Sequence, residues 1–418
     1  MKVLVLGAGV IGVTCAYYLN RAGHEVVIVD RQSGPAMETS FANAGGVCPG
    51  FAGPWAAPGM PWKLARWLLE RHAPLSFRLR PDSHQWRWLA AFLRNCSPER
   101  FVDNKARMQR IAHYSKACLT SLREETGIAY DQQSAGVLQI FRTEAECALA
   151  LHSSNVLESF GIRHTIVNAE IATTIEPALK RSTVSIAGGL HLPDDETGDC
   201  HLFTTRLADL LREQGVAFQF DTTIRGLPAE GGRITGIVTD KGVMSADRYV
   251  VALGSEAPLL LHPLGIDLPV YPVKGYSITL AIDNDDSAPR SSVMDEHTKV
   301  MITRLGARLR AAGVAEIGGY DRDTDPRRAS GVRAAAAALF PDAGDYDRVT
   351  YWSGLRPMTP DGPPYLGATH LPNLFLNLGQ GSNGWTQACG CGRIVANLVS
   401  GAAPEIDLDG LTLMDRKT

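Results

Sequence analysis

The sequence predicts an α/β protein in which two architectures are interleaved. The chain opens with alternating strand and helix patterns between Lys2 and Val29, which indicate parallel strands. Between Leu268 and Gly318 the apolar residues alternate instead as in the hairpins of a mainly antiparallel sheet. At 418 residues the chain is too long for one simple core, so we expect two domains.

The first thirty residues contain a complete strand–loop–helix–strand unit. Lys2–Leu6 is a short apolar run of the kind that is buried on both faces of a sheet. Gly-Ala-Gly-Val-Ile-Gly follows at 7–12, then a helix pattern over Val13–Ala22 and a second apolar strand over Glu25–Val29, which ends at Asp30. The order of strand, GxGxxG, helix, strand and acidic residue is the dinucleotide-binding fingerprint.

Each part of this fingerprint has a chemical role in holding a dinucleotide. Gly7 permits the tight turn, Gly9 lets the backbone approach a pyrophosphate, and Gly12 lets the helix pack close to the strand. The free amide groups of the helix N-terminus, beside Val10, attract phosphate. The Asp30 carboxylate can accept hydrogen bonds from ribose hydroxyls.

Two later segments of small residues are candidates for further cofactor contact. The loop Thr39–Gly46 carries Ser and Asn donors that suit phosphate and ring oxygens, and a plain loop is the alternative. The strand pattern Tyr249–Ser255 also ends in small residues. Because small side chains at the carboxyl end of a strand leave room for a cofactor, we expect a second nucleotide contact there.

Tryptophan and basic residues are concentrated between positions 55 and 100. Five of the seven tryptophans lie there, and residues 60–100 hold eight Lys or Arg against three Asp or Glu. Helix patterns run over 63–72, 84–95 and 98–126. We interpret the stretch as a packed helical subdomain with a solvated face; a surface that rests on a membrane is the alternative.

Two glycine-containing stretches stand out near the C-terminus. In the first, at 352–362, Arg356 lies between glycine and proline turns that stiffen the backbone. A fixed guanidinium fork is the best single side chain for a carboxylate, whereas a surface salt bridge is the ordinary alternative. The second, at 378–385, is a glycine loop between a strand and a helix, and this helix also directs its positive end toward an anion or an electron-rich ring.

Composition excludes several classes of function. The net charge of −3 argues against nucleic-acid binding, and the eight cysteines show no metal-ligand spacing, so we expect no metal. No apolar run is long enough to span a bilayer, and the N-terminal apolar run leads into the fingerprint rather than into a cleavage site. We expect a cytoplasmic protein. The tail beyond Glu405 has few core residues and is expected to be poorly ordered.

Taken together, these motifs resemble the FAD-dependent D-amino acid oxidase superfamily and, within it, the group of bacterial D-amino acid dehydrogenase small subunits. Five or more motifs in the right order are far more specific than any one of them. The resemblance covers residues 2–406 and is carried by GAGVIG with Asp30, TSFANAGG, LPDDETGDCHLFT at 192–204, YPVKGYSIT at 271–279, GLRPMTPDGPP and LGQGSNGW.

The resemblance implies a fold and an activity. The fold would be a glutathione-reductase-type, Rossmann-like FAD-binding domain (1–55, 162–262 and 350–405) interleaved with an α+β substrate domain (56–161 and 263–349) on a mainly antiparallel sheet, with a tail at 406–418. Non-covalent FAD would take hydride from the Cα of a D-amino acid at flavin N5, giving a 2-oxo acid and ammonia. Electrons would pass to a quinone or another respiratory acceptor, at the cytoplasmic face of the inner membrane.

The resemblance also assigns roles to individual residues. Arg356 would bind the substrate carboxylate. Glycine oxidases carry an arginine where Ser382 stands, and a tyrosine that helps to hold the carboxylate is replaced near Val300, so Tyr276, Tyr320 and Arg304 are candidates for the second carboxylate contact. The cofactor-binding residues implied are Gly7, Gly9, Val10, Ile11, Gly12, Asp30, Arg31, Ser40, Asn43, Ala44, Gly45, Gly46, Ile224, Ala252, Gly254, Lys274, Gly354, Arg356, Gly381, Ser382, Asn383, Gly384 and Trp385.

Other functions stay open at this point. Within flavin chemistry, the alternatives are an oxidase that uses O2 or an enzyme for proline-like or N-methylated amino acids. An NAD-dependent reductase is a different class, and the second glycine loop and the interleaved sheet argue against it. A non-catalytic flavoprotein subunit is a third.

Overall fold

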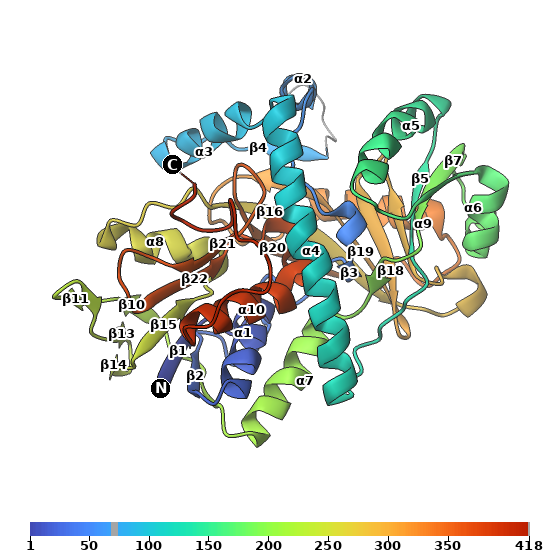
Figure 1. Cartoon of the computed structure of the whole chain (residues 1–418). Helices are drawn as coiled ribbons and strands as arrows, with labels where there is room; N and C mark the ends of the chain where they lie inside the picture. The colour runs from blue at the N-terminus through green and yellow to red at the C-terminus, as the bar shows by residue number, and fades with distance from the viewer. Residues whose placement is uncertain (68–73, 417–418) are drawn as a thin grey trace.

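The structure, a computed structural model, describes residues 1–67 and 74–416. Two large sheets stand next to each other in it, and helices cover both (Figure 1). The first sheet contains, in spatial order, β21 (Tyr365–Ala368), β22 (Leu374–Leu378), β15 (Arg248–Val251), β1 (Lys2–Leu6), β2 (Glu25–Val29) and β9 (Ala217–Gln219). All of its pairs are parallel except β21 with β22, as the opening pattern of the chain predicts.

The second sheet is larger and mainly antiparallel. Its antiparallel pairs include the long contact of β16 with β19 and β20, whereas β17 with β5 and β19 with β4 are parallel. Its strands, in spatial order, are β20 (Thr350–Met358), β16 (Tyr271–Ala281), β19 (Arg308–Ile317), β18 (Val300–Leu305), β17 (Ser292–Asp295), β5 (Val137–Phe141), β7 (Gly188–Leu192) and β6 (Thr165–Asn168), with β4 (Leu75–Phe77) beside β19.

Helix α1 (Val10–Arg21) follows the first glycine loop and packs against α10 (Gly384–Val399). The two helices approach closely because α10 carries glycine at the contact: a Cβ on Gly392 would lie 2.9 Å from the Cys15 nitrogen. The 29-residue α4 (Pro98–Thr126) crosses α10 on its other side and runs the height of the molecule in Figure 1. A Cβ on Gly390 would lie 2.7 Å from the Ser115 Cα of α4, so this crossing also depends on glycine.

The helix patterns predicted at 84–95 and 98–126 correspond to α3 and α4, with bounds that differ by at most one residue. Helix α4 has the expected bounds, with the Ser97 hydroxyl accepting from the Arg100 amide at 3.4 Å, and residues 68–72 of the predicted helix 63–72 lie outside the described residues. None of the described helices has the length and apolar character that crossing a bilayer requires. The helices not yet given are α2 (Met60–Trp67), α3 (Ser83–Arg94), α5 (Glu144–Ser159), α6 (Ala169–Ile175), α7 (Cys200–Glu213), α8 (Ala257–Leu261) and α9 (Pro326–Leu339).

Small pairings complete the strands. They comprise β3 (Gly46–Val47) with β8 (Glu196–Thr197), β11 (Ala229–Glu230) with β12 (Arg233–Ile234), and the ladder of β10 (Ile224–Gly226), β13 (Ile237–Thr239) and β14 (Gly242–Met244). Strands β6, β7 and β20 pair in the larger sheet, although the expected boundaries assign their residues to the FAD-binding domain. The boundaries therefore do not follow the sheets at these three strands.

The expectation of a poorly ordered tail is wrong for residues 406–416. Leu411 is fully buried, and its carbonyl accepts from the Leu366 amide at 2.8 Å. Arg416 donates to the carbonyls of Pro363 and Pro364, at 2.9 Å each. One buried leucine and one arginine anchor the tail, which a low density of apolar residues does not reveal.

Candidate active site

A cavity of about 980 Å³ is lined by residues from both sheets. It brings together most residues that the sequence singles out, from segments far apart in the chain. Those that line it are Gly7, Gly9, Val10, Ile11, Asp30, Arg31, Ser40, Asn43, Ala44, Gly45, Gly46, Ile224, Ala252, Gly254, Tyr276, Gly354, Arg356, Gly381, Ser382, Asn383, Gly384 and Trp385.

The first glycine loop has a shape that side chains would obstruct. Gly7 has φ +110°, and a Cβ there would lie 2.5 Å from the Ala252 oxygen. Gly12 lies outside the cavity lining, and a Cβ on it would lie 1.9 Å from the Gly7 oxygen. Among the described residues, a Cβ on Gly9 would have only the Ser40 hydroxyl within 4 Å, at 3.4 Å. The loop therefore packs tightly at Gly7 and Gly12 and leaves open space at Gly9, on the cavity side, as a cradle for a pyrophosphate requires.

Asp30 is held by the backbone around it. Its carboxylate accepts from the Ala8 amide at 2.6 Å and from the Gln32 amide at 2.8 Å. Burial raises the pKa of Asp30, and these two hydrogen bonds oppose that rise. Because a carboxylate has about four acceptor positions, the side chain can still accept from a ligand hydroxyl.

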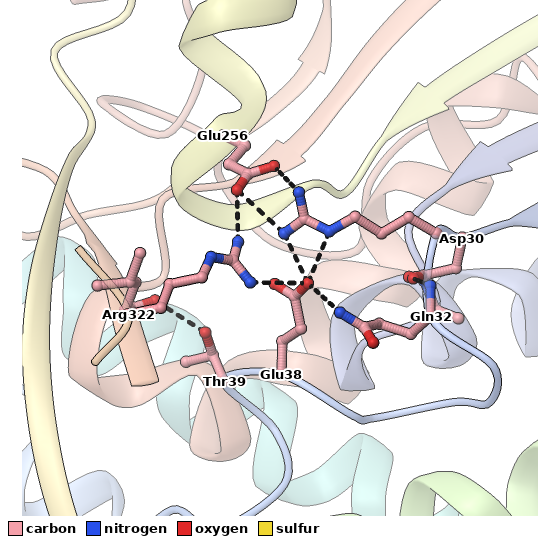
Figure 2. A network of polar contacts seen from close by, with 9 residues as sticks. Asp30, Gln32, Glu38, Thr39, Glu256 and Arg322 are labelled. Carbon is pink, nitrogen blue, oxygen red and sulfur yellow. Dashed lines mark hydrogen bonds and ion pairs between the residues drawn. The ribbon is translucent and has the colours of Figure 1, made fainter. Parts of the chain in front are cut away.

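A ring of four charged side chains lies at this end of the cavity (Figure 2). Arg31 and Arg322 each pair with both Glu38 and Glu256; the Arg31–Glu38 and Arg322–Glu38 distances are 2.6 and 3.1 Å. Gln32 also donates to Glu38, at 2.8 Å. Burial alone would raise the pKa of Glu38, but the hydrogen bonds from Arg322 and Gln32 and the nearby charges lower it.

Sequence reasoning identifies only Arg31 among these four residues. Glu38 follows β2 in a loop, Glu256 follows β15, and Arg322 follows β19, so the ring joins segments of both sheets. The pairs Arg31–Glu256 and Arg322–Glu38 each join residues more than 200 positions apart, and no local pattern predicts such a pairing.

Arg356 belongs to β20 and lines the cavity. Its guanidinium donates to the Val314 carbonyl at 3.3 Å and lies 5.9 Å from the ring centre of Trp55. Burial lowers the pKa of Arg356 to about 10, and no carboxylate of the described residues pairs with it. The group therefore remains charged at neutral pH without a counter-ion, which favours an anionic ligand.

Of the three candidates for a second carboxylate contact, one lines the cavity and two do not. Tyr276 lines the cavity and donates to the Glu316 carboxylate at 3.0 Å, and burial together with that negative charge raises its pKa. Tyr320 lies outside the lining and donates to the Ser255 carbonyl at 3.1 Å. Arg304, also outside it, pairs with Asp285.

Lys274, which the resemblance assigns to the cofactor, lies outside the cavity lining. Its ammonium is buried and bonds to the Asp321 carboxylate at 3.0 Å and to the Asp323 carbonyl at 2.9 Å. Its position thus ties β16 to the segment after β19.

The late glycine loop reaches the cavity as a short helical turn at Gly381–Asn383, from which α10 begins. Gly379 and Gly381 both have positive φ, of +84° and +57°, which glycine adopts without strain. Trp385 is buried and donates to the Gly198 carbonyl at 3.1 Å, which holds the start of α10. The amide groups of this helix start lie on the cavity wall, where they favour negative charge.

The cavity also has an apolar end that sequence reasoning missed as a site. Trp55, Met60 and Trp67 line it, and they belong to the tryptophan-rich stretch that the sequence indicates. Lys105 of α4 lines the same end, and nothing in the helix pattern distinguishes it from a surface lysine.

Comparisons with known proteins agree in both sequence and fold. The family model "FAD dependent oxidoreductase" matches residues 2–398. A protein named D-amino acid dehydrogenase from Rhodopseudomonas palustris is 52% identical over 413 residues, which cover 99% of this chain and 97% of that protein. Another of the same name from Rhizorhabdus wittichii is 53% identical, with 99% of each chain covered.

Solved structures share the fold at low identity. Glycine oxidase from Geobacillus kaustophilus superposes with a TM-score of 0.77 at 22% identity, with both chains covered completely. L-proline dehydrogenase from P. horikoshii superposes with a TM-score of 0.73 at 19% identity, over 99% of this chain and 96% of that one. These likenesses confirm the predicted fold class.

Proposed function

Since this chain belongs to the FAD-dependent oxidoreductase family, we propose that it is a D-amino acid dehydrogenase that passes electrons to an acceptor other than O2. FAD is its cofactor and amino acid oxidation its reaction, as the sequence predicts. The product would be an imino acid, which water converts to a 2-oxo acid and ammonia. The relatives at 52 and 53% identity, which carry this name, support the assignment.

The observation that carries the proposal is the unpaired guanidinium of Arg356. A substrate carboxylate would supply the counter-ion that the described residues lack, and the fork would fix its orientation. Trp55 would bound the same space from the side. Positioning of this kind is the main contribution that a protein makes when a cofactor carries the chemistry.

The cofactor would lie along the predicted residues of the cavity. The cradle at Gly7 and Gly9 fits its pyrophosphate, and Asp30 fits a ribose. When bound, FAD accepts a hydride from the substrate Cα. The start of α10, which Asn383 precedes as N-cap, would stabilise negative charge on the reduced ring through its amide groups.

A peripheral contact with the inner membrane is proposed for α2 and α3. Trp62 is 82% exposed and Trp86 is 51% exposed, and each helix carries basic residues. Amphipathic helices with exposed tryptophan and basic side chains bind membrane interfaces. Packing of the helices against the rest of the protein accounts for Trp88, which is buried. It does not account for the exposure of Trp62 and Trp86.

The proposal is tested with the purified holoprotein under anaerobic conditions. D-alanine should bleach the flavin absorbance and L-alanine should not, and air should reoxidise the reduced protein slowly, with little peroxide. Rapid peroxide formation would identify an oxidase instead. Faster bleaching by L-proline or sarcosine than by any D-amino acid would favour the alternative substrates.

A further inference from the structure

Beyond Arg356, the cavity extends into an apolar arm. We define the arm by six side chains that line it: Trp55, Met60, Trp67, Leu75, Phe92 and Phe101. Trp55 faces both regions, because its ring lies 5.9 Å from the Arg356 guanidinium. The arm is therefore continuous with the site proposed for the amino acid.

Lys105 places one cation in this apolar surrounding. Its side chain approaches the backbone near Trp55, since its Cδ would lie 4.0 Å from a Cβ on Gly53. No described residue forms a hydrogen bond or ion pair with its ammonium, and burial lowers the pKa of Lys105. An unpaired ammonium among aromatic rings stabilises an oxygen that gains negative charge.

Helix α2 separates the arm from the outer surface. Met60 and Trp67 of this helix line the arm, whereas Trp62 and Lys63 are exposed on its outer side. One short helix thus connects the interior arm with the surface that carries the exposed tryptophans. A lipophilic ligand would pass from an interface into the arm over a short path.

We propose that the apolar arm is the binding site of a lipophilic quinone, with the Lys105 ammonium donating a hydrogen bond to one quinone oxygen. This inference rests on the proposed function, which requires an acceptor other than O2. The quinone takes up two electrons from the reduced cofactor and two protons, one from the cofactor and one from solvent, and becomes a hydroquinone. The aromatic side chains would stack on its ring, and the lysine would favour the product-like, more negative oxygen.

The two half-reactions separate this inference from the proposed function. Anaerobic reduction by D-alanine reports on the amino acid site, and reoxidation by decylubiquinone reports on the arm. In Lys105→Met, reoxidation by decylubiquinone should slow at least about tenfold, as expected for loss of one hydrogen bond to a charged group. Reoxidation by ferricyanide, which needs no apolar site, should stay within about twofold. Lys105→Arg should recover most of the quinone rate, and Lys180→Met, which removes an exposed lysine, is the matched control.

A second variant and a binding measurement keep the test decisive if Lys105→Met does not fold. Ala57 also lines the cavity, so Ala57→Phe should narrow the arm and slow decylubiquinone but not ferricyanide. Decylubiquinone should also quench tryptophan fluorescence of the oxidised protein, with a dissociation constant that rises at least about fivefold in Lys105→Met. Unchanged quinone rates in both variants would overturn the inference. So would a selective loss of affinity for D-amino acids with long side chains, which would make the arm a side-chain pocket. Failure of D-alanine to reduce the wild-type flavin would instead refute the proposed function.

Discussion

Gly275 and Arg356 lie on neighbouring strands so close together that a Cβ on residue 275 would be 2.4 Å from the Arg356 Cζ. The guanidinium therefore occupies the space that a side chain on β16 would otherwise take. Since Arg356 reaches this position with the far end of a flexible side chain, a methyl group there would displace the guanidinium without disrupting the sheet.

Gly275→Ala should accordingly raise the KM for a D-amino acid about tenfold, the cost of weakening one charge-assisted hydrogen bond. FAD content should not change, and the melting temperature should fall by only a few degrees. Steady-state kinetics measure the KM, and flavin absorbance measures the FAD content. Gly331→Ala is the control, because a Cβ there has no atom of the described residues within 4 Å. A KM equal to that of the wild type would show that the guanidinium position does not matter.

Arg356→Lys should raise the KM for D-amino acids about 30-fold while FAD remains bound, because lysine keeps the charge and loses the bidentate fork. The Arg348→Lys variant changes an exposed arginine and should behave as the wild type. Loss of FAD without a change in KM would remove Arg356 from the amino acid site and place it at the cofactor.

Binding of a carboxylate should depend on pH through Arg356, whose pKa burial lowers to about 10. Below that pKa the guanidinium is protonated, so the inhibition constant of a simple carboxylate should be constant between pH 7 and pH 9. Above it the charged form is lost, and the inhibition constant should rise toward tenfold per pH unit. A competitive inhibitor without an amino group, such as propionate, avoids titration of a substrate amine. A constant value up to pH 11 would contradict the assignment.

The sequence predicts the parts of the site that local chemistry determines. Gly7, Gly9 and Asp30 belong to one contiguous unit, and their spacing within it is specific to dinucleotide binding. Arg356 is found because the glycine and proline turns around it are recognisable in the sequence. Lys274 belongs to an equally distinctive segment, yet its side chain pairs with Asp321 outside the cavity lining. Successive residues of a strand point to opposite faces of the sheet, and it is the neighbouring residue Gly275 that lines the cavity.

Long-range pairing accounts for what sequence reasoning missed. Glu256 pairs with both Arg31 and Arg322 only because the ends of β2, β15 and β19 meet at one place. Lys105 belongs to the site only because α4 passes the cavity at that turn. The antiparallel sheet itself is predicted as a class, but the assignment of β6, β7 and β20 to it depends on non-local pairing.

The charged ring in Figure 2 should affect cofactor affinity more than stability. Glu38→Gln removes the carboxylate that accepts from Arg31, Gln32 and Arg322. Arg31 follows Asp30 in the sequence, and the Gln32 amide donates to the Asp30 carboxylate. We expect the dissociation constant of FAD to rise about threefold to tenfold, with a stability loss of at most about 1 kcal/mol because the side chains are about one-third exposed. Reconstitution of the apoprotein, followed by flavin fluorescence, measures the affinity.

Asp347→Asn is the matched control for this ring, since it removes one carboxylate from an ion pair whose acidic side chain is 92% exposed. It should leave FAD affinity and melting temperature unchanged. An FAD dissociation constant that is equal in Glu38→Gln and in the wild type would limit the ring to a structural contact.

The anchored tail gives the last prediction. The Arg416 side chain is 7% exposed, pairs with Asp361 and lies 3.7 Å from the ring centre of Tyr365. Arg416→Ala should lower the free energy of unfolding by about 3 kcal/mol, because it leaves a largely buried carboxylate without its partner. Adding Asp361→Asn should recover part of this loss, since the second change removes the unpaired charge. Denaturant unfolding of the two variants and the wild type measures the difference. Equal stability of Arg416→Ala and the wild type would show that the tail contributes nothing to the fold, and that its low density of apolar residues is the better guide.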